Sequence, residues 1–237
     1  MNSFDWSVFS HLLFSTDFLR PMGITFFATI ASMVLGSIIG LVGGVLSLHQ
    51  NSFLRRVLHV YTWIFRGIPT LVQIIFWYDA LPELTENIIN LPPLWAGVLA
   101  LAVNEGAYMT EIIRAGILSV DEGQQEAAKA LGMPSRKILF TIVIPQAMRF
   151  IIPPTGNQII NMLKNTSLLF AIAVPEIFSA GMNIYSVNFR YFEVIATMSI
   201  LYLFLSSIVT IFIRFIENIF SIDYAINQST KKLSNAL

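Results

Sequence analysis

The sequence contains no cysteine and few charged residues. Of its 237 residues, 12% are charged and 55% are hydrophobic, and the mean hydropathy is +0.70. The absence of cysteine excludes disulfides, thiolate nucleophiles and cysteine-based zinc sites. Soluble domains carry about 25% charged residues, so this composition indicates an integral membrane protein. The net charge is zero, and nucleic acid is not an expected partner because its binding depends on an excess of basic residues.

Three motifs of ATP-binding and hydrolytic proteins are also absent. The sequence has no Gly-x-x-x-x-Gly-Lys-Ser/Thr, no Gly-x-Ser-x-Gly and no His-Glu-x-x-His. We therefore expect no catalytic residue, no metal site and no cofactor in this chain. No Lys or Arg precedes Arg20, so the N-terminus lacks the basic region of a cleavable signal peptide, and we expect no processing.

Long apolar stretches are what the sequence has in abundance. A spanning helix needs about 20 apolar residues, and five stretches meet that need, at about residues 21–48, 57–78, 94–115, 146–166 and 191–214. The stretch 168–178 is too short to cross and is expected to be re-entrant or interfacial. Gly36, Gly40 and Gly44 share one helix face, which permits close helix packing. Packing within the chain is favoured over a contact between two copies.

The basic residues indicate the orientation of these spans. Lys and Arg occur in the loops 49–56 and 114–137, and Lys231 and Lys232 lie in the C-terminal tail, whereas the loop 79–93 carries only acidic charges. By the positive-inside rule, the N-terminus is expected outside and the C-terminus in the cytoplasm. With no internal repeat or long linker, residues 1–237 are expected to form one membrane domain.

A polar segment interrupts the apolar pattern between the third and fourth spans. The residues EAAKALGMPSRKILFTIVIP run from Glu126 to Pro145. Strong helix formers predict a helix at about 119–132, begun by a capping box of Ser119 and Glu122. Gly132 is a suitable helix stop that needs a positive φ. Apolar residues at i, i+3 and i+4 form a stripe too small for a core and suited to a groove in another protein; they are Ala127, Ala130 and Leu131.

This segment resembles a family signature. Glu126-Ala127-Ala128, three residues, Gly132, nine residues and Ile142-x-Ile144-Pro145 resemble the EAA signature of ABC importer permeases. The family has Leu where this chain has Ile144. The stretches 61–78, 107–128 and 130–169 are similar to the polar amino-acid branch, and the resemblance covers about 61–217. It implies an all-α type I importer transmembrane domain in the cell inner membrane, with a cytoplasmic coupling helix that includes Glu126, Ala127, Ala128, Ala130, Leu131 and Gly132.

The resemblance also implies a function and partners. The expected function is import of polar amino acids, with ATP and Mg bound on a separate ATPase present in two copies. The expected complex also contains a second permease subunit, identical or homologous, and an external binding protein. The permease subunits lie within the lipid membrane. Import of another small polar solute such as an opine is the alternative within the same architecture. An ion-coupled carrier or channel working alone is an alternative of another class, and it leaves the cytoplasmic helix without a purpose. A non-transporting membrane scaffold is a third class.

Polar residues inside the spans are costly and usually functional. Glu105 is either a counter-charge for the substrate or a partner for Arg66 or another base. The break at Arg66-Gly67-Ile68-Pro69-Thr70 either offers backbone amides to a substrate carboxylate or is a packing kink. Asn157, Asn161 and Lys164 form a stripe that lines either the pathway or a subunit seam, and the alternative for Lys164 is to extend its ammonium group to the outer surface. Glu111 and Arg114 are expected to pair structurally. The expected substrate pathway comprises Arg66, Gly67, Pro69, Thr70, Asn104, Glu105, Asn157, Asn161 and Lys164.

Overall fold

The computed structural model describes residues 4–234, with side chains described for residues 4–219. Regular structure in residues 4–234 is helical, without a strand, which confirms the all-α prediction. The α-helices are α1 (Trp6–Leu13), α2 (Leu19–Leu46), α3 (Ser52–Gly67), α4 (Thr70–Ile75), α5 (Leu81–Leu84), α6 (Pro93–Leu118), α7 (Glu122–Ala130), α8 (Ser135–Ile138), α9 (Ile144–Asn165), α10 (Ile177–Asn188) and α11 (Tyr191–Ser234). Residues Thr16–Phe18 and Thr166–Ile172 are 3-10 helices, and Phe76–Ala80 and Leu139–Val143 are π-helical. The side chains of Lys231 and Lys232, used for the expected orientation, lie outside the described ones.

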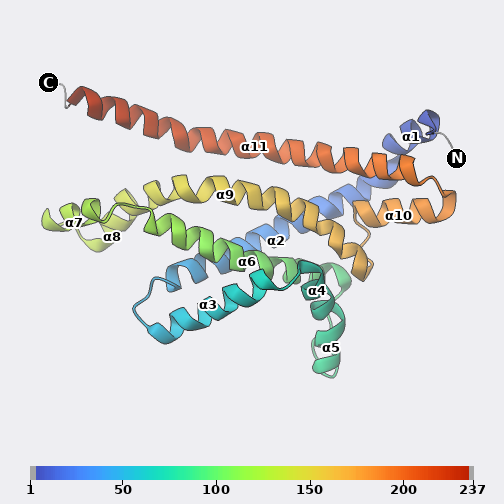
Figure 1. Ribbon diagram of the computed structural model, residues 1–237, viewed down its shortest axis with the longest axis horizontal. Coiled ribbons are helices and arrows are strands. Elements are labelled where there is room, and N and C mark those ends of the chain that lie inside the picture. The colour runs from blue at the N-terminus through green and yellow to red at the C-terminus, as the bar shows by residue number, and fades with distance from the viewer. Residues whose placement is uncertain (1–3, 235–237) are drawn as a thin grey trace.

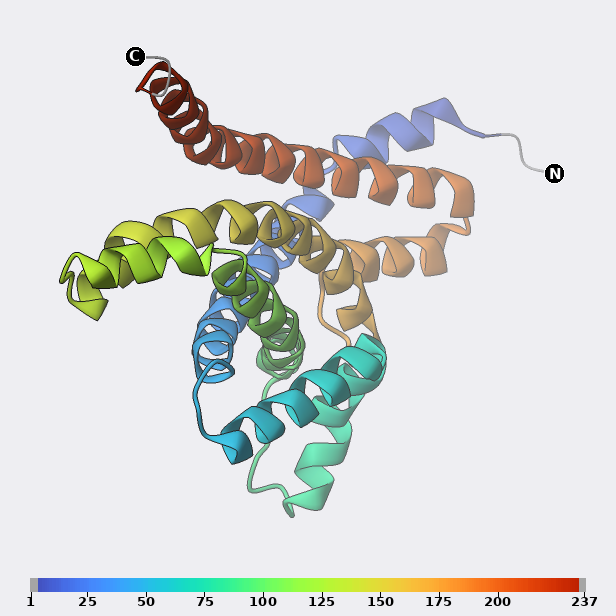
Figure 2. The same ribbon diagram turned by 60° about the vertical axis from the view of Figure 1, so that its left-hand side comes forward.

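The long helices run roughly along one axis of the molecule. Helices α6 and α9 lead to α7 and α8 at one end, and α1 and α10 lie at the opposite end (Figures 1 and 2). Helix α11 starts beside α1 and extends along the molecule toward the end that carries α7 (Figure 1). The first and last described residues therefore lie at opposite ends of the long axis.

The lengths of the helices suit a membrane protein. Three segments among the described residues are long and apolar enough to cross a membrane, Thr16–Leu46, Ser135–Ile172 and Tyr191–Ile219. The other two predicted spans correspond to α6 and to the interrupted helix α3–α4. With 26 residues, α6 is about 39 Å long at 1.5 Å per residue, which exceeds a hydrocarbon core of about 30 Å. The total of five spans stays a prediction.

The glycine face of α2 packs directly against α6. A Cβ atom added to Gly36 would lie 2.8 Å from the Cβ of Glu105, and one added to Gly40 would overlap Met109. Gly44 faces Ile113 in the same way, so residues four apart on one helix meet residues four apart on the other. Small residues let two backbones approach closely without lipid between them. The prediction that these glycines pack within the chain is confirmed.

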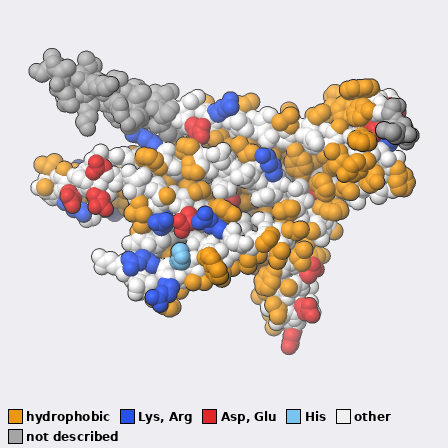
Figure 3. Space-filling model, in the orientation of Figure 1, with side chains coloured by type: hydrophobic (Ala, Val, Ile, Leu, Met, Phe, Trp, Pro, Cys, Tyr) orange, Lys and Arg blue, Asp and Glu red, His pale blue; other side chains and the backbone are white. Residues whose placement is uncertain are grey.

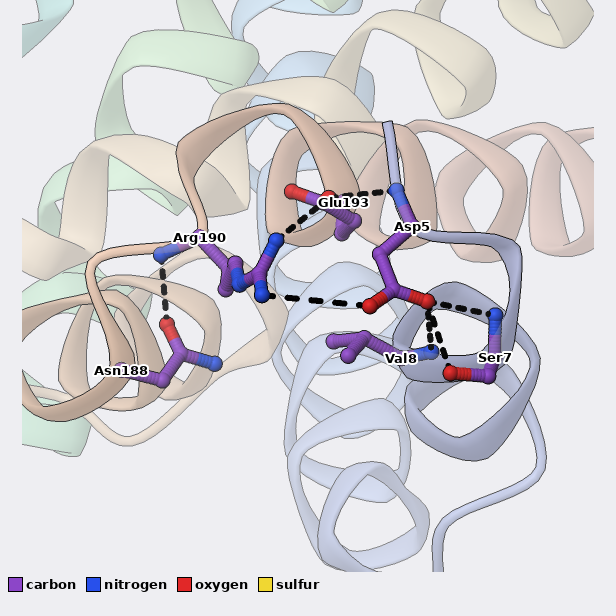
Figure 4. Close-up of polar contacts among 6 residues, drawn as sticks. All are labelled: Asp5, Ser7, Val8, Asn188, Arg190 and Glu193. Atoms are coloured by element: carbon purple, nitrogen blue, oxygen red, sulfur yellow. Dashed lines mark hydrogen bonds and ion pairs between the residues drawn. The ribbon is translucent and has the colours of Figure 1, made fainter. Parts of the chain in front are cut away.

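A polar cluster fixes α1 to the turn between α10 and α11 (Figure 4). The carboxylate of Asp5 accepts hydrogen bonds from the backbone amides of Ser7 and Val8, at 2.9 and 3.3 Å, and from the Ser7 hydroxyl at 2.7 Å. The backbone amide of Asp5 donates to Glu193, and Arg190 lies 3.8 Å from Asp5 and 3.7 Å from Glu193. The Ser7 hydroxyl, followed by the two backbone amides, holds the pKa of Asp5 below its ordinary value of 3.8.

The segment after α9 does not form a spanning helix. Its 3-10 helix ends at Ala173, which has φ 57°, and Glu176 then caps the N-terminus of α10. The buried Glu176 carboxylate accepts hydrogen bonds from the amides of Phe178 and Ser179 and from the hydroxyl of Tyr202 at 2.6 Å. The prediction that residues 168–178 are too short to cross agrees with this geometry, whereas helix α10 itself had no sequence prediction.

Candidate functional site

Helix α7 is a short helix bounded on both sides, as the sequence predicts. It ends where Gly132 adopts φ 74°, and the amide of Met133 donates to the carbonyl of Ala128 at 3.1 Å. This bond and the one from the Gly132 amide to Lys129 form a Schellman stop. Pro134 follows and caps α8. The predicted positive φ at Gly132 is confirmed.

The start of α7 differs from the predicted capping box. Ser119 is the C-cap of α6, and its hydroxyl donates to the carbonyl of Gly116. The N-cap of α7 is Asp121, whose carboxylate accepts a hydrogen bond from the Gly123 amide at 2.7 Å. The prediction that Ser119 caps the helix is wrong, because α6 continues to Leu118 and Ser119 keeps a helical backbone, with ψ −9°, whereas Asp121 has the non-helical ψ of 121° that an N-cap needs.

The two faces of α7 have different surroundings. Ala128 is buried against a cluster that includes Ile138, Val143 and Ala147. The side chain of Gln146 on α9 donates to Gln124 at 2.6 Å, and no spacing in the sequence predicts this bond between α7 and α9. The remaining members of the predicted coupling set are exposed: Glu126, Ala127, Ala130, Leu131 and Gly132. Leu131 is 83% exposed. An apolar stripe is therefore available for another protein on the face that this chain does not cover.

The break in the second predicted span is a fixed joint. Helix α3 ends at Gly67, and Ile68 and Pro69 are extended before α4 begins at Thr70. The Gln73 amide donates to the carbonyls of Phe65 and Ile68 at 2.9 and 2.8 Å, and the Asn104 amide donates to Phe65 at 2.6 Å. These bonds satisfy carbonyls that the break frees. The amides of Thr70 and Leu71 lie in the first turn of α4, where amides have no acceptor within the helix. Whether the break binds a substrate carboxylate or is a packing kink stays open.

Glu105 is buried between helices rather than paired with a base. It is 4% exposed, and its side chain packs against the backbone of Gly36. Its Oε1 atom has no hydrogen-bond partner among the described residues. Arg66 instead lies over the ring of Tyr108, 5.3 Å from its centroid. The described residues therefore contain no ion pair between Glu105 and Arg66, and that structural alternative is not formed.

The polar stripe on α9 is left open by this chain. Asn157, Asn161 and Lys164 are all exposed, although α9 lies within one of the segments that can cross a membrane. Amide and ammonium groups facing lipid would be costly. The stripe therefore requires either water or another protein subunit against it, and both sequence interpretations remain open.

Glu111 and Arg114 form the ion pair that their spacing predicts. The Nη2 atom of Arg114 lies 2.9 Å from Oε2 of Glu111, and the Nε atom lies 3.3 Å from the same oxygen. Both side chains are partly exposed, so the pair contributes little to stability by itself. It lies on α6, one helical turn from the end that leads into α7.

Comparisons with known proteins agree with this arrangement. The model of the family described as "Binding-protein-dependent transport system inner membrane component" matches residues 32–220. The probable amino-acid permease protein YxeN of Bacillus subtilis is 37% identical over 224 residues, which cover 94% of this chain and 99% of that protein. The arginine transport system permease protein ArgU of Corynebacterium glutamicum is 37% identical over 230 residues, covering 92% of this chain and 72% of that protein.

A solved structure supports the same assignment. The fold is similar to the crystal structure of an amino acid ABC transporter with histidines, with a TM-score of 0.82 and 31% sequence identity. The similarity covers 92% of this chain and 99% of that one. Since the family model spans most of the sequence and the relatives match over nearly its whole length, the chain belongs to the family of binding-protein-dependent transport system inner membrane components, the permease subunits of ABC importers.

Proposed function

We propose that this permease subunit carries polar amino acids inward, driven by ATP hydrolysis on a separate ATPase. The exposed, doubly bounded helix α7 is the observation that carries the proposal. An energy-coupled permease without an ATP-binding motif needs a surface that receives motion from its partner, and α7 offers one. The substrate class rests on the names of the relatives, which include an amino-acid permease and an arginine permease.

The stripe on α7 supports docking into the ATPase. Ala127, Ala130 and Leu131 are exposed on one side, while Ala128 fixes the opposite side to the body of the protein. A helix held on one side and apolar on the other suits a groove. Glu126 and Gly132 frame this surface. ATP and Mg bind the ATPase in this proposal, and this chain binds neither.

The open stripe on α9 supports a complex with a second permease subunit. Asn157, Asn161 and Lys164 cannot face lipid cheaply, so a partner of the same kind or a water-filled path between two subunits covers them. The complex then contains two permease subunits, identical or homologous, and two ATPases, with a binding protein delivering substrate from outside.

The substrate path is proposed to run past the break and the stripe. Its members are Arg66, Gly67, Pro69, Thr70, Asn104, Glu105, Asn157, Asn161 and Lys164. An amino acid brings an ammonium and a carboxylate into the membrane, and each needs a polar partner. Glu105 is the acidic group with a buried oxygen that has no partner within the described residues, and it would meet the ammonium once helix movement exposes it.

The N-terminus is proposed to be external and the C-terminus cytoplasmic. Basic residues surround α7, whereas Asp79, Glu83 and Glu86 are the charges of the 79–93 loop. Because the protein lacks cysteine, Glu83→Cys and Arg136→Cys can each be labelled alone. A membrane-impermeant thiol reagent should label Glu83→Cys in intact cells and Arg136→Cys only after lysis. The reverse pattern would invert the topology.

The function is tested with the permease, its ATPase and its binding protein reconstituted together in vesicles. A panel of amino acids is scored for uptake and for stimulation of ATP hydrolysis. Leu131→Glu should abolish both, because it places a charge in the docking stripe. Leu84→Glu is the matched control, since Leu84 is also exposed, at 71%, and lies away from α7. Normal coupled uptake by Leu131→Glu would overturn the docking proposal, and failure of every amino acid to stimulate would overturn the substrate class.

A further inference from the structure

An open cleft of about 870 Å³ lies between α3 and α6, beside the end of α2. Its volume falls within the roughly 300–1,000 Å³ of ligand pockets. Helix α3 forms one wall, and the last turns of α6 form the other. The basic residues that line it are Arg55, Arg56, His59, Arg66 and Arg114. Figure 3 shows basic side chains gathered over α3 and the neighbouring part of α6.

The cleft has an excess of positive charge. Four arginines face one carboxylate, Glu111, which leaves three guanidinium charges uncompensated. Glu111 is already bonded to Arg114. Among the described residues, no carboxylate lies within ion-pair distance of Arg55, Arg56 or Arg66. Such an arrangement is repulsive when the cleft is empty, and a multiply charged oxyanion relieves the repulsion.

Arginine is well suited to a phosphate group. Its planar guanidinium donates two parallel hydrogen bonds to phosphate oxygens. Arg55 and Arg56 lie near the start of α3, toward the end of the molecule that carries α7 (Figure 1). In the proposed orientation this is the cytoplasmic side, where anionic lipid headgroups attract basic residues.

The surroundings of the cleft suit a lipid better than a soluble anion. Trp63 and Leu58 line it, and Trp63 is 71% exposed. Phe53, Val57 and Val60 are also exposed on α3. A phosphate bound at the arginines would therefore have apolar surface beside it, which acyl chains can cover and a free ion cannot.

We propose that this cleft binds the phosphate of an anionic phospholipid from the cytoplasmic leaflet. Arg55 and Arg56 contact the phosphate, and the exposed apolar side chains of α3 contact the acyl chains. The leaflet rests on the proposed orientation, but lipid binding itself does not depend on transport. Thiol labelling tests the orientation separately, so the two failures are distinguishable.

The test uses the assembled complex of permease and ATPase in nanodiscs of phosphatidylcholine, with phosphatidylglycerol of the same acyl chains as the added probe. Retained lipid is measured by native mass spectrometry across a titration. The wild-type complex should bind phosphatidylglycerol in preference to phosphatidylcholine. The double variant Arg55→Gln/Arg56→Gln should weaken that binding by about 25-fold, at about fivefold for each basic residue.

A matched variant separates a site from general surface charge. Arg136→Gln/Lys137→Gln removes two adjacent exposed basic residues near α7 and outside the cleft, and it should leave phosphatidylglycerol binding unchanged. Equal losses in the two double variants, or no loss in either, would overturn the proposal. Inorganic phosphate and ATP are added as competitors in molar excess. Displacement of the lipid by either would reassign the cleft to a soluble phosphate compound.

Discussion

Replacement of Gly132 tests whether the stop of α7 is needed for coupling. Gly132 has φ 74°, and a Cβ atom built on it meets nothing within 4 Å. A side chain there therefore costs backbone strain and no steric overlap. The left-handed conformation costs an L-residue roughly 1–2 kcal/mol, and a β-branched residue resists it most. Gly132→Val should shift the conformational equilibrium away from the native turn by about 5- to 30-fold.

Loss of the turn displaces the chain on its C-terminal side. The amides of Gly132 and Met133 would lose their bonds to Lys129 and Ala128, and α7 would no longer be held at a fixed angle to α8. Uptake of labelled amino acid into vesicles should fall by roughly tenfold, while the yield of the purified permease stays near wild type. Substrate-stimulated ATP hydrolysis should fall in parallel, because the motion is no longer transmitted.

Two further variants make the reasoning refutable. Asn adopts the left-handed conformation more readily than other non-glycine residues, so Gly132→Asn should retain most of the uptake. Gly23→Val is the matched control, since its Cβ also meets nothing within 4 Å and its φ is not positive. If Gly132→Asn is as defective as Gly132→Val, the cause is a side chain on the docking surface and not the backbone. If Gly132→Val transports normally, the stop has no part in coupling.

Three other changes test the packing and the charges. Gly40→Val should lower the melting temperature, because its Cβ overlaps Met109 and overpacking costs about 1–3 kcal/mol; a melting temperature equal to that of Gly23→Val would contradict a tight α2–α6 crossing. Glu105→Gln should keep or raise thermal stability, because it removes a buried carboxylate with an unpartnered oxygen. It should lower uptake at least about tenfold if that carboxylate meets the substrate, since a charged hydrogen bond is worth about 1.5–3 kcal/mol. Normal uptake would remove Glu105 from the pathway. The Asp5 carboxyl has a lowered pKa in the folded protein, so its stabilisation of α1 is present above 3.8 and is lost as the pH falls through the lowered pKa. The difference in the stability of α1 between wild type and Asp5→Asn should vanish only below the lowered pKa of Asp5. It is measured by the fluorescence of Trp6 in a background in which Trp63, Trp77 and Trp95 are replaced by Phe.

Local sequence signals predicted the parts of the structure that depend on neighbours in the chain. Gly132 and Pro134 predicted the stop of α7, and the four-residue glycine spacing predicted the face of α2 that packs on α6. Ser119 and Asp121 are both good capping residues, and the choice between them depends on where α6 ends. A local motif could not decide that, because it does not show that α6 continues to Leu118.

Contacts between residues that are distant in the sequence could not be predicted from local motifs. Glu176 accepts from the amides of the helix that it caps and from Tyr202, 26 positions away, and no spacing rule links it to that tyrosine. Gln73 satisfies the carbonyls at the break, and its presence as a single amide in an apolar stretch was the available signal. For Glu105 the sequence indicated a costly buried charge, but the absence of a base beside it required the positions of α2, α3 and α6 together.

The hydrogen bond from Asn104 to the carbonyl of Phe65 connects the break mechanically to α6. It joins the end of α3 to the middle of α6, and α6 leads after Ser119 and Val120 directly into α7. Between Asn104 and Leu118 the helix is a rod of about 21 Å, with α7 at one end and the break at the other. When α6 tilts as a rigid body, its two ends move in opposite directions. A displacement of α7 is then transmitted through α6 to the break at Ile68–Pro69 without any unfolding between them. The glycine crossing with α2 lies along the same rod, so that a movement of α6 also acts on the close contact between α6 and Gly36, Gly40 and Gly44.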